Sequence, residues 1–392
     1  VDLAMKWLPH IAYETCINQT FSSLNKASGY DDYLVSMKSF TTPTQKFAFA
    51  STSGDIALKV QGSFPIKKPG QGKMILDGSK SSSDWLGRIP FERTPIVKNP
   101  ERGFISSANQ HSTDTSYPYY YYGYFEDYRS RTLNRKLSSK SDWTVEDMKH
   151  LQNDNYSQLA ADFCPVLIDL IIDTLGSTVW LSNMQKWDFH YRKEQIEPIF
   201  FDDWYQRFYR YTWDEFYEQS DDLQINTPEV WRTIEMTSQM PEDSVFDIQA
   251  TKDLTETATM LALKAFNESV QYVDSLLDAD RSYNYGKHRP ITINHLTRIP
   301  AFSLQGVEVG STARALNAMR GTHGPSWRMI VKLSNPSVEA WGIYPGGQSG
   351  NPGSLYYKHT VADWAAGNYY PLHFVQNPES LGSNVTQKIV FS

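Results

Sequence analysis

The strand-like patterns of this sequence lie near its two ends, and a long helical block separates them. Lys46–Ser51 and Ile56–Val60 are apolar runs joined by a Ser-Gly-Asp turn, a combination that predicts a β-hairpin. Near the other end, Met329–Leu333 and Ala340–Tyr344 are typical of strands. A chain that returns to strands after its helices is expected to form an α+β or layered architecture with a helical insertion.

The helical block begins with a recognisable start signal. Thr144 followed by Asp147 resembles a capping box, and helical patterns then continue to about Trp187. A second helix is predicted over 200–217 and a third over 254–277. The second helix carries aromatic residues at helical spacing, which we interpret as core positions, with a binding groove as the alternative: Phe201, Trp204, Tyr205, Phe208 and Tyr211.

The segments around the first hairpin predict less regular structure. We expect two short helices before it, starting at Leu3–Trp7 and continuing over Leu24–Phe40. Residues 65–103 are rich in proline and glycine and predict loops. Phe104–Ala108 is expected to be a short strand that leads into Asn109.

Composition excludes several classes of protein. Lys and Arg total 37 and Asp and Glu total 44, so the formal net charge of −7 argues against a protein that binds nucleic-acid phosphates. Two cysteines, Cys16 and Cys164, cannot make a disulfide framework. The longest apolar run, Val166–Ile172, is too short to span a bilayer. The front of the chain lacks both an initiator Met and a signal-peptide pattern, so we expect it to be processed, excised or truncated.

General chemical motifs are missing or degenerate. No Walker A sequence occurs, because the glycine-rich run 346–350 has no Lys-Ser/Thr pair after it, and it does not fit Gly-x-Ser-x-Gly. The histidines show no zinc-binding spacing. The acidic stretch from Asp202 and Asp203 to Asp221 and Asp222 is interpreted as a solvated helix face.

One segment nevertheless has a specific resemblance. Asn99–Gln110 resembles the Asn-Pro-x-x-Gly-(aromatic)-Ile-x-x-x-Asn segment of the penicillin acylase family, which are N-terminal-nucleophile amidohydrolases. Four further segments resemble the same family in the same order, and together they extend the resemblance from Leu3 to about Phe374. They are Gln45–Ser63, Asp84–Phe91, Gly324–Arg328 and Pro345–Pro352.

The resemblance implies a fold and a division of the chain. The fold is the four-layer αββα Ntn-hydrolase sandwich, incomplete in this chain. Residues 1–140 would form part of that core with the oxyanion-hole segment, 141–285 a mainly helical insertion, and 286–392 the C-terminal strands that return to the core.

The resemblance also implies an activity, which is hydrolysis of a linear amide. In the family, a zymogen cleaves itself and frees a serine whose hydroxyl attacks the amide and whose α-amine acts as base. Residue 1 is valine here, so the nucleophile is expected outside this chain. The expected partner is the other half of the acylase, its α-subunit and the front of its catalytic subunit. Penicillins, acyl-homoserine lactones and other small acylated amines all remain open as substrates. Family members work mainly in the periplasm or outside the cell.

Two site residues are carried over from the resemblance. Asn109 matches the asparagine whose side-chain amide helps form the oxyanion hole, where N–H donors stabilise charge that develops on the carbonyl oxygen. Arg129 falls at the family's active-site arginine, counted back from the helix that starts at Thr144, and its cation would orient Asn109. A slip to Arg131, or a surface role for Arg129, stays open.

No cofactor or metal is predicted. Some family members bind calcium partly through a backbone carbonyl at the position of Pro65, but the acidic ligand expected after Asn109 falls near Tyr121. The tyrosine run Tyr117–Tyr122 is interpreted as a stiff surface loop, with an aromatic pocket as the alternative. A non-catalytic binding or scaffolding protein of the same fold is the rival to the enzyme, and the residue at a self-cleavage point upstream of Val1 would separate the two.

Overall fold

The structure is a computed structural model that describes residues 2–10, 17–123, 125–217, 226–334, 337–375, 377–385 and 387–390. The chain divides into two units. The first consists of Val1–Trp143, Val331–Glu339 and Phe374–Ser392, and the second of Thr144–Ile330 and Ala340–His373. Each unit is described by itself below, and whether they correspond to a core and an insertion stays a prediction.

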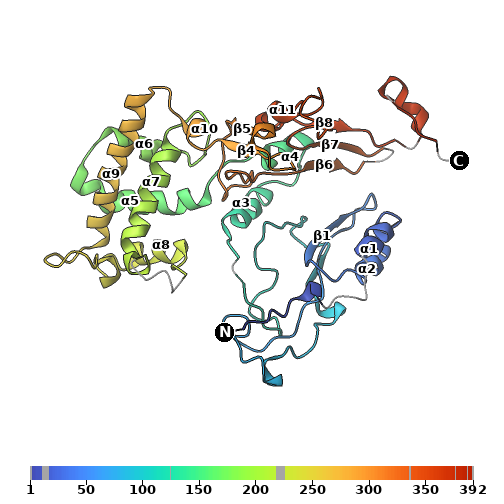
Figure 1. Ribbon diagram of the computed structural model, residues 1–392, viewed down its shortest axis with the longest axis horizontal. Helices are drawn as coiled ribbons and strands as arrows, with labels where there is room; N and C mark the ends of the chain where they lie inside the picture. The colour runs from blue at the N-terminus through green and yellow to red at the C-terminus, as the bar shows by residue number, and fades with distance from the viewer. Residues whose placement is uncertain are drawn as a thin grey trace. The chain divides into compact units, whose positions relative to one another are not determined.

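A three-stranded antiparallel sheet forms the centre of the first unit. Its strands are β1 (Gln45–Ala50), β2 (Ile56–Gln61) and β3 (Ile96–Lys98), in the order β1-β2-β3. Gln45 pairs with Gln61 and Ala50 with Ile56, so the predicted hairpin is confirmed. In Figure 1, the helices α1 (Ile17–Leu24) and α2 (Tyr30–Met37) lie beside β1.

The two faces of this sheet differ because side chains alternate along a strand. Phe47 and Phe49 point to the face that packs on aromatic side chains from α2 and the turn after it. The ring of Phe49 lies 5.0 Å from that of Tyr33, and the ring of Phe47 lies 4.8 Å from that of Phe40. The opposite face of the hairpin carries two cross-strand pairs, Lys46 with Val60 and Ala48 with Leu58. That second face forms the floor of the pocket described below.

Several expectations for the first unit are wrong. Leu3–Trp7 is not helical, and the only helical turn in residues 2–10 is a 3-10 helix at Leu8–His10. Segment 65–103 is mostly irregular, as expected, but it contains β3, which at three residues is too short to give a readable pattern. It also holds two 3-10 helices, Ser81–Ser83 and Phe91–Arg93.

Phe104–Ala108 is not a strand. Here the side chain of Gln110 bonds the backbone in place of a neighbouring strand. Its Nε2 donates to the carbonyl of Ser106 at 3.3 Å, and its Oε1 accepts from the backbone N–H of Ala108 at 2.7 Å. The helix α3 (Tyr128–Leu137) ends the continuous part of this unit.

Helices dominate the second unit, as predicted. In Figure 1, the long helices lie together, and α7 and α9 pack closely along one another. Thr144 caps α4 through a capping box with Asp147, which confirms that expectation. The helices are α4 (Val145–Gln152), α5 (Gln158–Leu175), α6 (Val179–Lys186), α7 (Glu197–Thr212), α8 (Val230–Gln239), α9 (Ala258–Ala279) and α10 (Tyr285–His288), with 3-10 turns at Asp214–Phe216 and Ser244–Phe246.

The aromatic positions of α7 belong to the core of this unit. Phe201, Trp204 and Phe208 are fully buried, and the indole N–H of Trp204 donates to the carbonyl of Ala262 on α9 at 3.0 Å. Tyr205 and Tyr211 are half-buried. The interpretation of these residues as core positions is therefore confirmed. Cys164 is also buried in this core, and burial raises the pKa of its thiol.

The acidic stretch that starts on α7 is not uniformly solvated, which corrects that expectation. The hydroxyl of Tyr191 donates to Oδ1 of Asp202 at 2.8 Å, and burial raises the pKa of Asp202 to about 6. Asp203 instead forms an ion pair with Arg207. The carboxyl group of Asp202 is buried because this residue lies between the core residues Phe201 and Trp204 in the sequence of α7. Asp221 and Asp222 lie outside the described residues.

Two small sheets lie mainly in the second unit. β4 (Ile291–Ile293) pairs antiparallel with β5 (Leu304–Val307). The other sheet has the order β6-β7-β8 and confirms both strands predicted near the C-terminus. Its strands are β6 (Arg328–Lys332), β7 (Glu339–Ile343) and β8 (Tyr370–Leu372). The helix α11 (Val361–Ala366) precedes β8, and 3-10 helices occur at Pro300–Phe302 and, in the first unit, at Pro378–Asn384.

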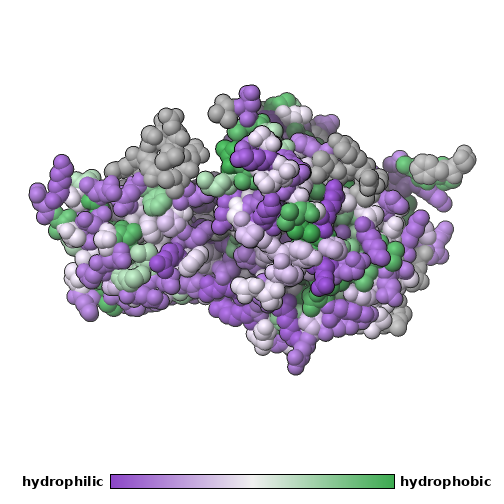
Figure 2. Space-filling view, turned by 90° about the horizontal axis from the view of Figure 1, so that it is seen from below, coloured by the Kyte–Doolittle hydropathy of each residue, from purple (hydrophilic) through white to green (hydrophobic). Residues whose placement is uncertain are grey.

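The surface is mixed in character. On the face shown in Figure 2, hydrophilic residues cover most of the surface and hydrophobic ones lie singly or in small groups. Within the described ranges, none of the helices combines the length and the apolar composition that a membrane crossing requires.

Candidate active site

The segment that leads to Asn109 is fixed to the start of β2. Asn99 adopts a left-handed backbone conformation, with φ of 44°, which asparagine tolerates better than most residues. Its Oδ1 accepts from the backbone N–H of Ile56 at 2.8 Å, and its Nδ2 donates to Asp55 at 2.7 Å. The backbone N–H of Gly103 then closes a turn on the carbonyl of Pro100. The Asn-Pro-x-x-Gly motif therefore fixes the beginning of this segment to the start of β2.

Asn109 itself sits on a tight bend of the chain. Its φ is 66°, again in the left-handed region, and its side chain is exposed. Bonds from the next residue hold the bend, since Gln110 clamps Ala108 and Ser106 as described above and its carbonyl accepts from Nζ of Lys46 at 2.8 Å. The amide of Asn109 therefore projects from a backbone that is fixed on both sides.

Arg129 contacts this amide directly. Its Nη2 donates to Oδ1 of Asn109 at 2.7 Å. Because the guanidinium occupies the carbonyl oxygen, the Nδ2 group of Asn109 is directed elsewhere, and no described residue accepts from it. Arg129 is the second residue of α3, where a cation opposes the helix dipole. A favourable contact with Asn109 offsets that cost.

The sequence left Arg131 as an alternative to Arg129. Arg131 is exposed and lies two residues further along α3, so its side chain leaves the helix about 200° around the axis. Asn109 therefore receives its hydrogen bond from Arg129. The structure brings together the two residues named from the resemblance, and their catalytic roles stay predictions.

Asn134 is a further member of this arrangement that sequence reasoning missed. Its Oδ1 accepts from Oγ of the buried Ser106 at 2.8 Å and from Nη1 of Arg102 at 3.1 Å. Its Nδ2 donates to the carbonyl of Ser130, one turn earlier on α3, at 2.8 Å. Asn134 thus ties the segment before Asn109 to the helix that carries Arg129. Its position five residues after Arg129 on α3 gave no signal of this contact.

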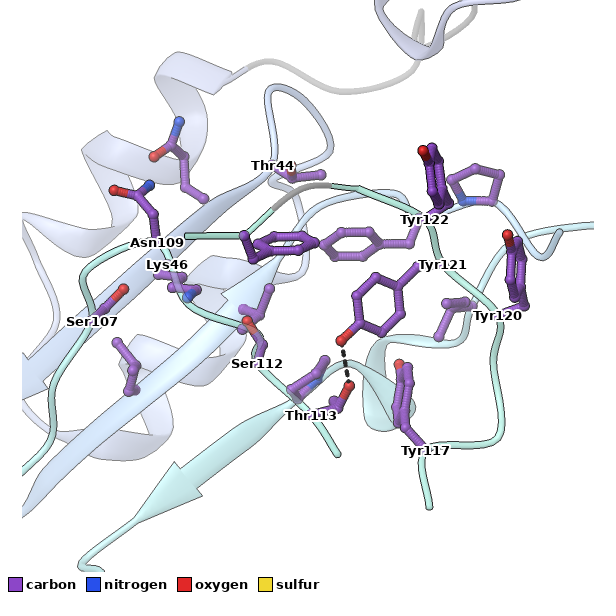
Figure 3. A pocket seen from close by; sticks show the side chains of 18 of the residues that line it. Thr44, Lys46, Ser107, Asn109, Ser112, Thr113, Tyr117, Tyr120, Tyr121 and Tyr122 are labelled. Atoms are coloured by element: carbon purple, nitrogen blue, oxygen red, sulfur yellow. Dashed lines mark hydrogen bonds between the residues drawn. The ribbon is translucent and has the colours of Figure 1, made fainter. Parts of the chain in front are cut away.

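A pocket of about 860 Å³ lies beside Asn109, within the size range of small-molecule sites. Its floor is the second face of the hairpin, with Lys46, Ala48, Leu58 and Val60. Its walls come from residues 105–122, from Phe125 and from loops after β2. Figure 3 shows Asn109 and Lys46 at one end of this pocket and the tyrosines at the other.

Tyrosines of the run Tyr117–Tyr122 line this pocket, as the alternative interpretation expected, while Tyr121 and Tyr122 are also exposed at the surface. The lining tyrosines are Tyr117, Tyr120, Tyr121 and Tyr122. A hydrogen bond between the hydroxyls of Thr113 and Tyr121, at 3.0 Å, is drawn in Figure 3. The ring of Tyr121 lies 5.8 Å from that of His111 and 6.0 Å from that of Phe125. A strand-like alternation of the sequence could not have predicted this lining, because the consecutive residues Tyr120, Tyr121 and Tyr122 all line the pocket.

The positions named for calcium lack the acidic ligand that the resemblance predicts. Tyr121 stands where an acidic ligand was expected, and its hydroxyl lies 2.9 Å from Nδ1 of His111. Across the described ranges, no three side chains of the His, Cys, Asp and Glu types come together as metal ligands would. The residues at these positions do not fit calcium, and we derive no step through a metal.

Comparisons with known proteins agree on one family. Residues 1–379 match the family model for penicillin amidase. An acyl-homoserine lactone acylase, QuiP, from Pseudomonas syringae pv. tomato is 24% identical over 400 residues, which cover 91% of this chain and 47% of the relative. Penicillin G acylase from Escherichia coli is 31% identical over 75 residues, 19% of this chain and 9% of that protein.

Among solved structures, a thermostable penicillin G acylase from Alcaligenes faecalis has a similar fold. The TM-score is 0.65 at 14% identity, and the match covers 95% of this chain and 72% of that one. This chain spans about half the length of the curated acyl-homoserine lactone acylase that it matches. The family model covers nearly the whole sequence, and the chain therefore belongs to the penicillin amidase family.

Proposed function

We propose that this chain is part of an acylase that hydrolyses linear amides, and that it supplies the oxyanion-hole asparagine, Asn109, and its supporting arginine, Arg129. The nucleophile is an N-terminal serine located outside this chain, freed when a zymogen cleaves itself. The complete fold is the four-layer αββα sandwich, of which this chain forms an incomplete part. Membership of the penicillin amidase family supports the amide-hydrolase reading.

The chemistry assigns a separate task to each group. The serine hydroxyl attacks the amide carbon, and its proton passes to the α-amine of the same serine. The carbonyl oxygen becomes negatively charged as the C–O bond forms, and Nδ2 of Asn109 donates to it. The C–N bond then breaks and the departing amine takes up the proton. Water hydrolyses the acyl-serine, which releases the acid and restores the nucleophile.

The contact between Arg129 and Asn109 is the observation that carries this proposal. An asparagine amide can present either its oxygen or its N–H group to a substrate, and only the N–H group stabilises an oxyanion. The guanidinium has no acceptor atom, so it can bond only the oxygen of the amide. With the 2.7 Å bond in place, the N–H group is the end that remains for a substrate.

The decisive experiment uses the complete enzyme that contains this chain. We expect the purified protein to release the amine from an N-acylated aniline, and we expect mass spectrometry to find a second chain that begins with a serine. Replacement of that serine by alanine should abolish both self-cleavage and hydrolysis. A protein that has no nucleophilic residue at a cleavage point, and that binds acylated amines without cleaving them, would instead be the non-catalytic relative.

The partner and the compartment follow from the same reading. We propose that this chain assembles with the α-subunit and with the front of the catalytic subunit of the same acylase, and that the assembled enzyme works in the periplasm or outside the cell. Co-purification of these segments with a tagged C-terminus tests the assembly, and fractionation of the cells that produce it tests the compartment.

A further inference from the structure

The hydroxyl of Tyr121 takes part in two hydrogen bonds in the pocket beside Asn109. Tyr121 and Thr113 both line the cavity, and Oγ1 of Thr113 donates to the phenol oxygen at 3.0 Å. Nδ1 of His111 lies 2.9 Å from the same oxygen. Figure 3 shows the ring of Tyr121 within the pocket and its hydroxyl directed at Thr113. A substrate therefore meets a hydroxyl whose bonding capacity is already partly used.

What remains of that capacity follows from a count. A phenol oxygen has one proton to donate and two lone pairs that accept, and Thr113 occupies one lone pair. The bond with His111 takes either the proton or the second lone pair. If Nδ1 carries no hydrogen, Tyr121 donates to it, and one lone pair remains for a substrate. If Nδ1 carries a hydrogen, both lone pairs are used, and the phenol proton remains for a substrate.

The protonation of His111 decides between these two arrangements. The side chain of His111 is exposed, so it exchanges protons with solvent. An imidazolium has hydrogen on both nitrogens, and its Nδ1 must then donate to Tyr121. In a neutral imidazole Nδ1 accepts instead, because the phenol O–H is the more acidic of the two donors. Histidine is the side-chain type whose charge ordinarily changes between about pH 5 and pH 8.

Charged and titratable groups lie on the elements around this network. Asp114 accepts from the backbone N–H of Ser116 at 2.9 Å, and the ring of Phe125 packs on the imidazole of His111 at 4.3 Å. The count at the phenol oxygen does not depend on these charges, so both arrangements exist whatever the pH at which they exchange. The groups are Lys46 on β1, Lys67 and Lys73 on the loop after β2, and Asp114, Tyr117 and Glu126 on the segment that carries the network.

We propose that Tyr121 is a specificity-determining residue and that His111 sets the sense of its hydrogen bond with the substrate. When His111 is neutral, the phenol oxygen accepts, and the pocket favours amides that carry an N–H donor. When His111 is protonated, the phenol donates, and the pocket favours amides that carry an acceptor. Leu58, Val60 and Ile105 supply apolar lining, where an unmatched polar group is costly. The proposal rests on the proposed function, because it concerns selection by the same site.

The experiment uses three amides whose five-membered rings differ in hydrogen bonding and stay uncharged between about pH 5 and pH 8. Pyrrole offers only an N–H donor, oxazole offers only acceptors, and thiophene serves as the reference with neither. One series carries the ring on the acyl half, as the anilides of the three ring-substituted acetic acids. The other series carries it on the amine half, as the hexanoyl amides of the three aminomethyl rings. The series that responds identifies the half that reaches Tyr121.

The readout is the ratio of kcat/KM for each ring to kcat/KM for thiophene in the same series, measured with the complete enzyme. The ratio cancels the pH dependence of the nucleophile, which all three substrates share. As the pH falls from about 8 to about 5, the oxazole ratio should rise about threefold to tenfold and the pyrrole ratio should fall by a similar factor.

Four variants separate the members of the network. Tyr121→Phe and His111→Phe should each leave both ratios independent of pH. Thr113→Val frees one lone pair, so the pyrrole ratio should lose its pH dependence while the oxazole ratio keeps it. His150→Phe is the matched control and should behave as wild type, because His150 is an exposed histidine on α4 that does not line the pocket.

Ratios that do not change with pH in either series, or that change equally in Tyr121→Phe, would overturn the proposal. If the wild-type enzyme cleaves none of the six amides, the proposed function fails, and calorimetry then tests the selectivity separately. The primary acetamides of the three rings are the ligands. The affinity of the oxazole ligand relative to the thiophene ligand should rise about threefold to tenfold from about pH 8 to about pH 5. A constant relative affinity, or no binding of the three ligands, would refute the assignment.

Discussion

The guanidinium of Arg129 donates to the side-chain oxygen of Asn109 at 2.7 Å. These residues lie 20 positions apart, one on a bend with φ of 66° and the other in the first turn of α3. The bond fixes which end of the asparagine amide is available to a substrate. The first two predictions follow from this relationship, and both concern the complete enzyme.

Asn109→Ala should lower kcat by about 10²–10³, because one oxyanion donor contributes roughly 3–4 kcal/mol to the barrier. The fold should stay intact, since the side chain of Asn109 is exposed. Steady-state hydrolysis of an N-acylated aniline measures the effect, and a thermal melt checks the fold. Near wild-type turnover would remove Asn109 from the site.

Arg129→Leu should lower kcat about 10- to 100-fold, because it removes a charge-assisted hydrogen bond and frees the asparagine amide to rotate. Arg131→Leu is the matched control and should change kcat much less, since its side chain leaves α3 in another direction. Equal, mild effects of the two substitutions would make both residues surface arginines. A larger effect at Arg131 would show that the assignment is wrong by two residues.

Asn134→Ala should affect both stability and turnover, because Asn134 links the segment before Asn109 to α3. Loss of its bonds to Ser106 and Arg102 should reduce the free energy of unfolding by about 1–3 kcal/mol. Asn134→Asp keeps an acceptor oxygen for both partners and should restore kcat. If Asn134→Ala is destabilised but keeps the wild-type kcat, the residue is structural and does not position the site.

A fourth prediction concerns the pH dependence of the second unit. Burial raises the pKa of Asp202 to about 6 in the folded chain, against about 3.9 in an unfolded one. The folded state therefore holds this proton more tightly, so the stability that it contributes is complete below about pH 4 and is lost as the pH rises to 6. A shift of about two pKa units corresponds to about 2–3 kcal/mol.

Asp202→Asn keeps an oxygen that can accept from Tyr191 but removes the titration. The free energy of unfolding of Asp202→Asn, relative to wild type, should therefore increase between pH 4 and pH 7. Denaturant titrations at several pH values measure this difference. Asp173→Asn, at an exposed carboxylate on α5, serves as the control. A difference that does not vary with pH would mean that Asp202 titrates normally.

The elements that the sequence predicted well are those whose signals are local. The Ser-Gly-Asp turn, the capping box at Thr144 and the aromatic spacing of α7 all lie within one element, and each is found as expected. The expected strand at Phe104–Ala108 failed because Gln110 bonds its backbone, an interaction that no periodicity encodes.

The residues of the candidate site also fall into those that the sequence could name and those that only the structure reveals. Asn109 and Arg129 could be named because a resemblance carried them, and composition or spacing alone would have left them as a turn residue and a surface arginine. Asn134 and Lys46 could not be named, because their significance depends on contacts with Ser106 and with the carbonyl of Gln110. Such contacts between distant segments exist only once the chain is folded.

The two-sided character of the β1–β2 hairpin has a consequence for protein engineering. On one side of the hairpin, Phe47 and Phe49 pack against the rings of Phe40 and Tyr33. On the other side, Ala48 and Leu58 line the pocket. Because alternate residues serve these two purposes, the hairpin separates the positions that set substrate range from those that set folding. A library restricted to positions 48, 58 and 60 should therefore change which amides are accepted while most of its members still fold, whereas Lys46 should be kept because it holds the bend at Asn109.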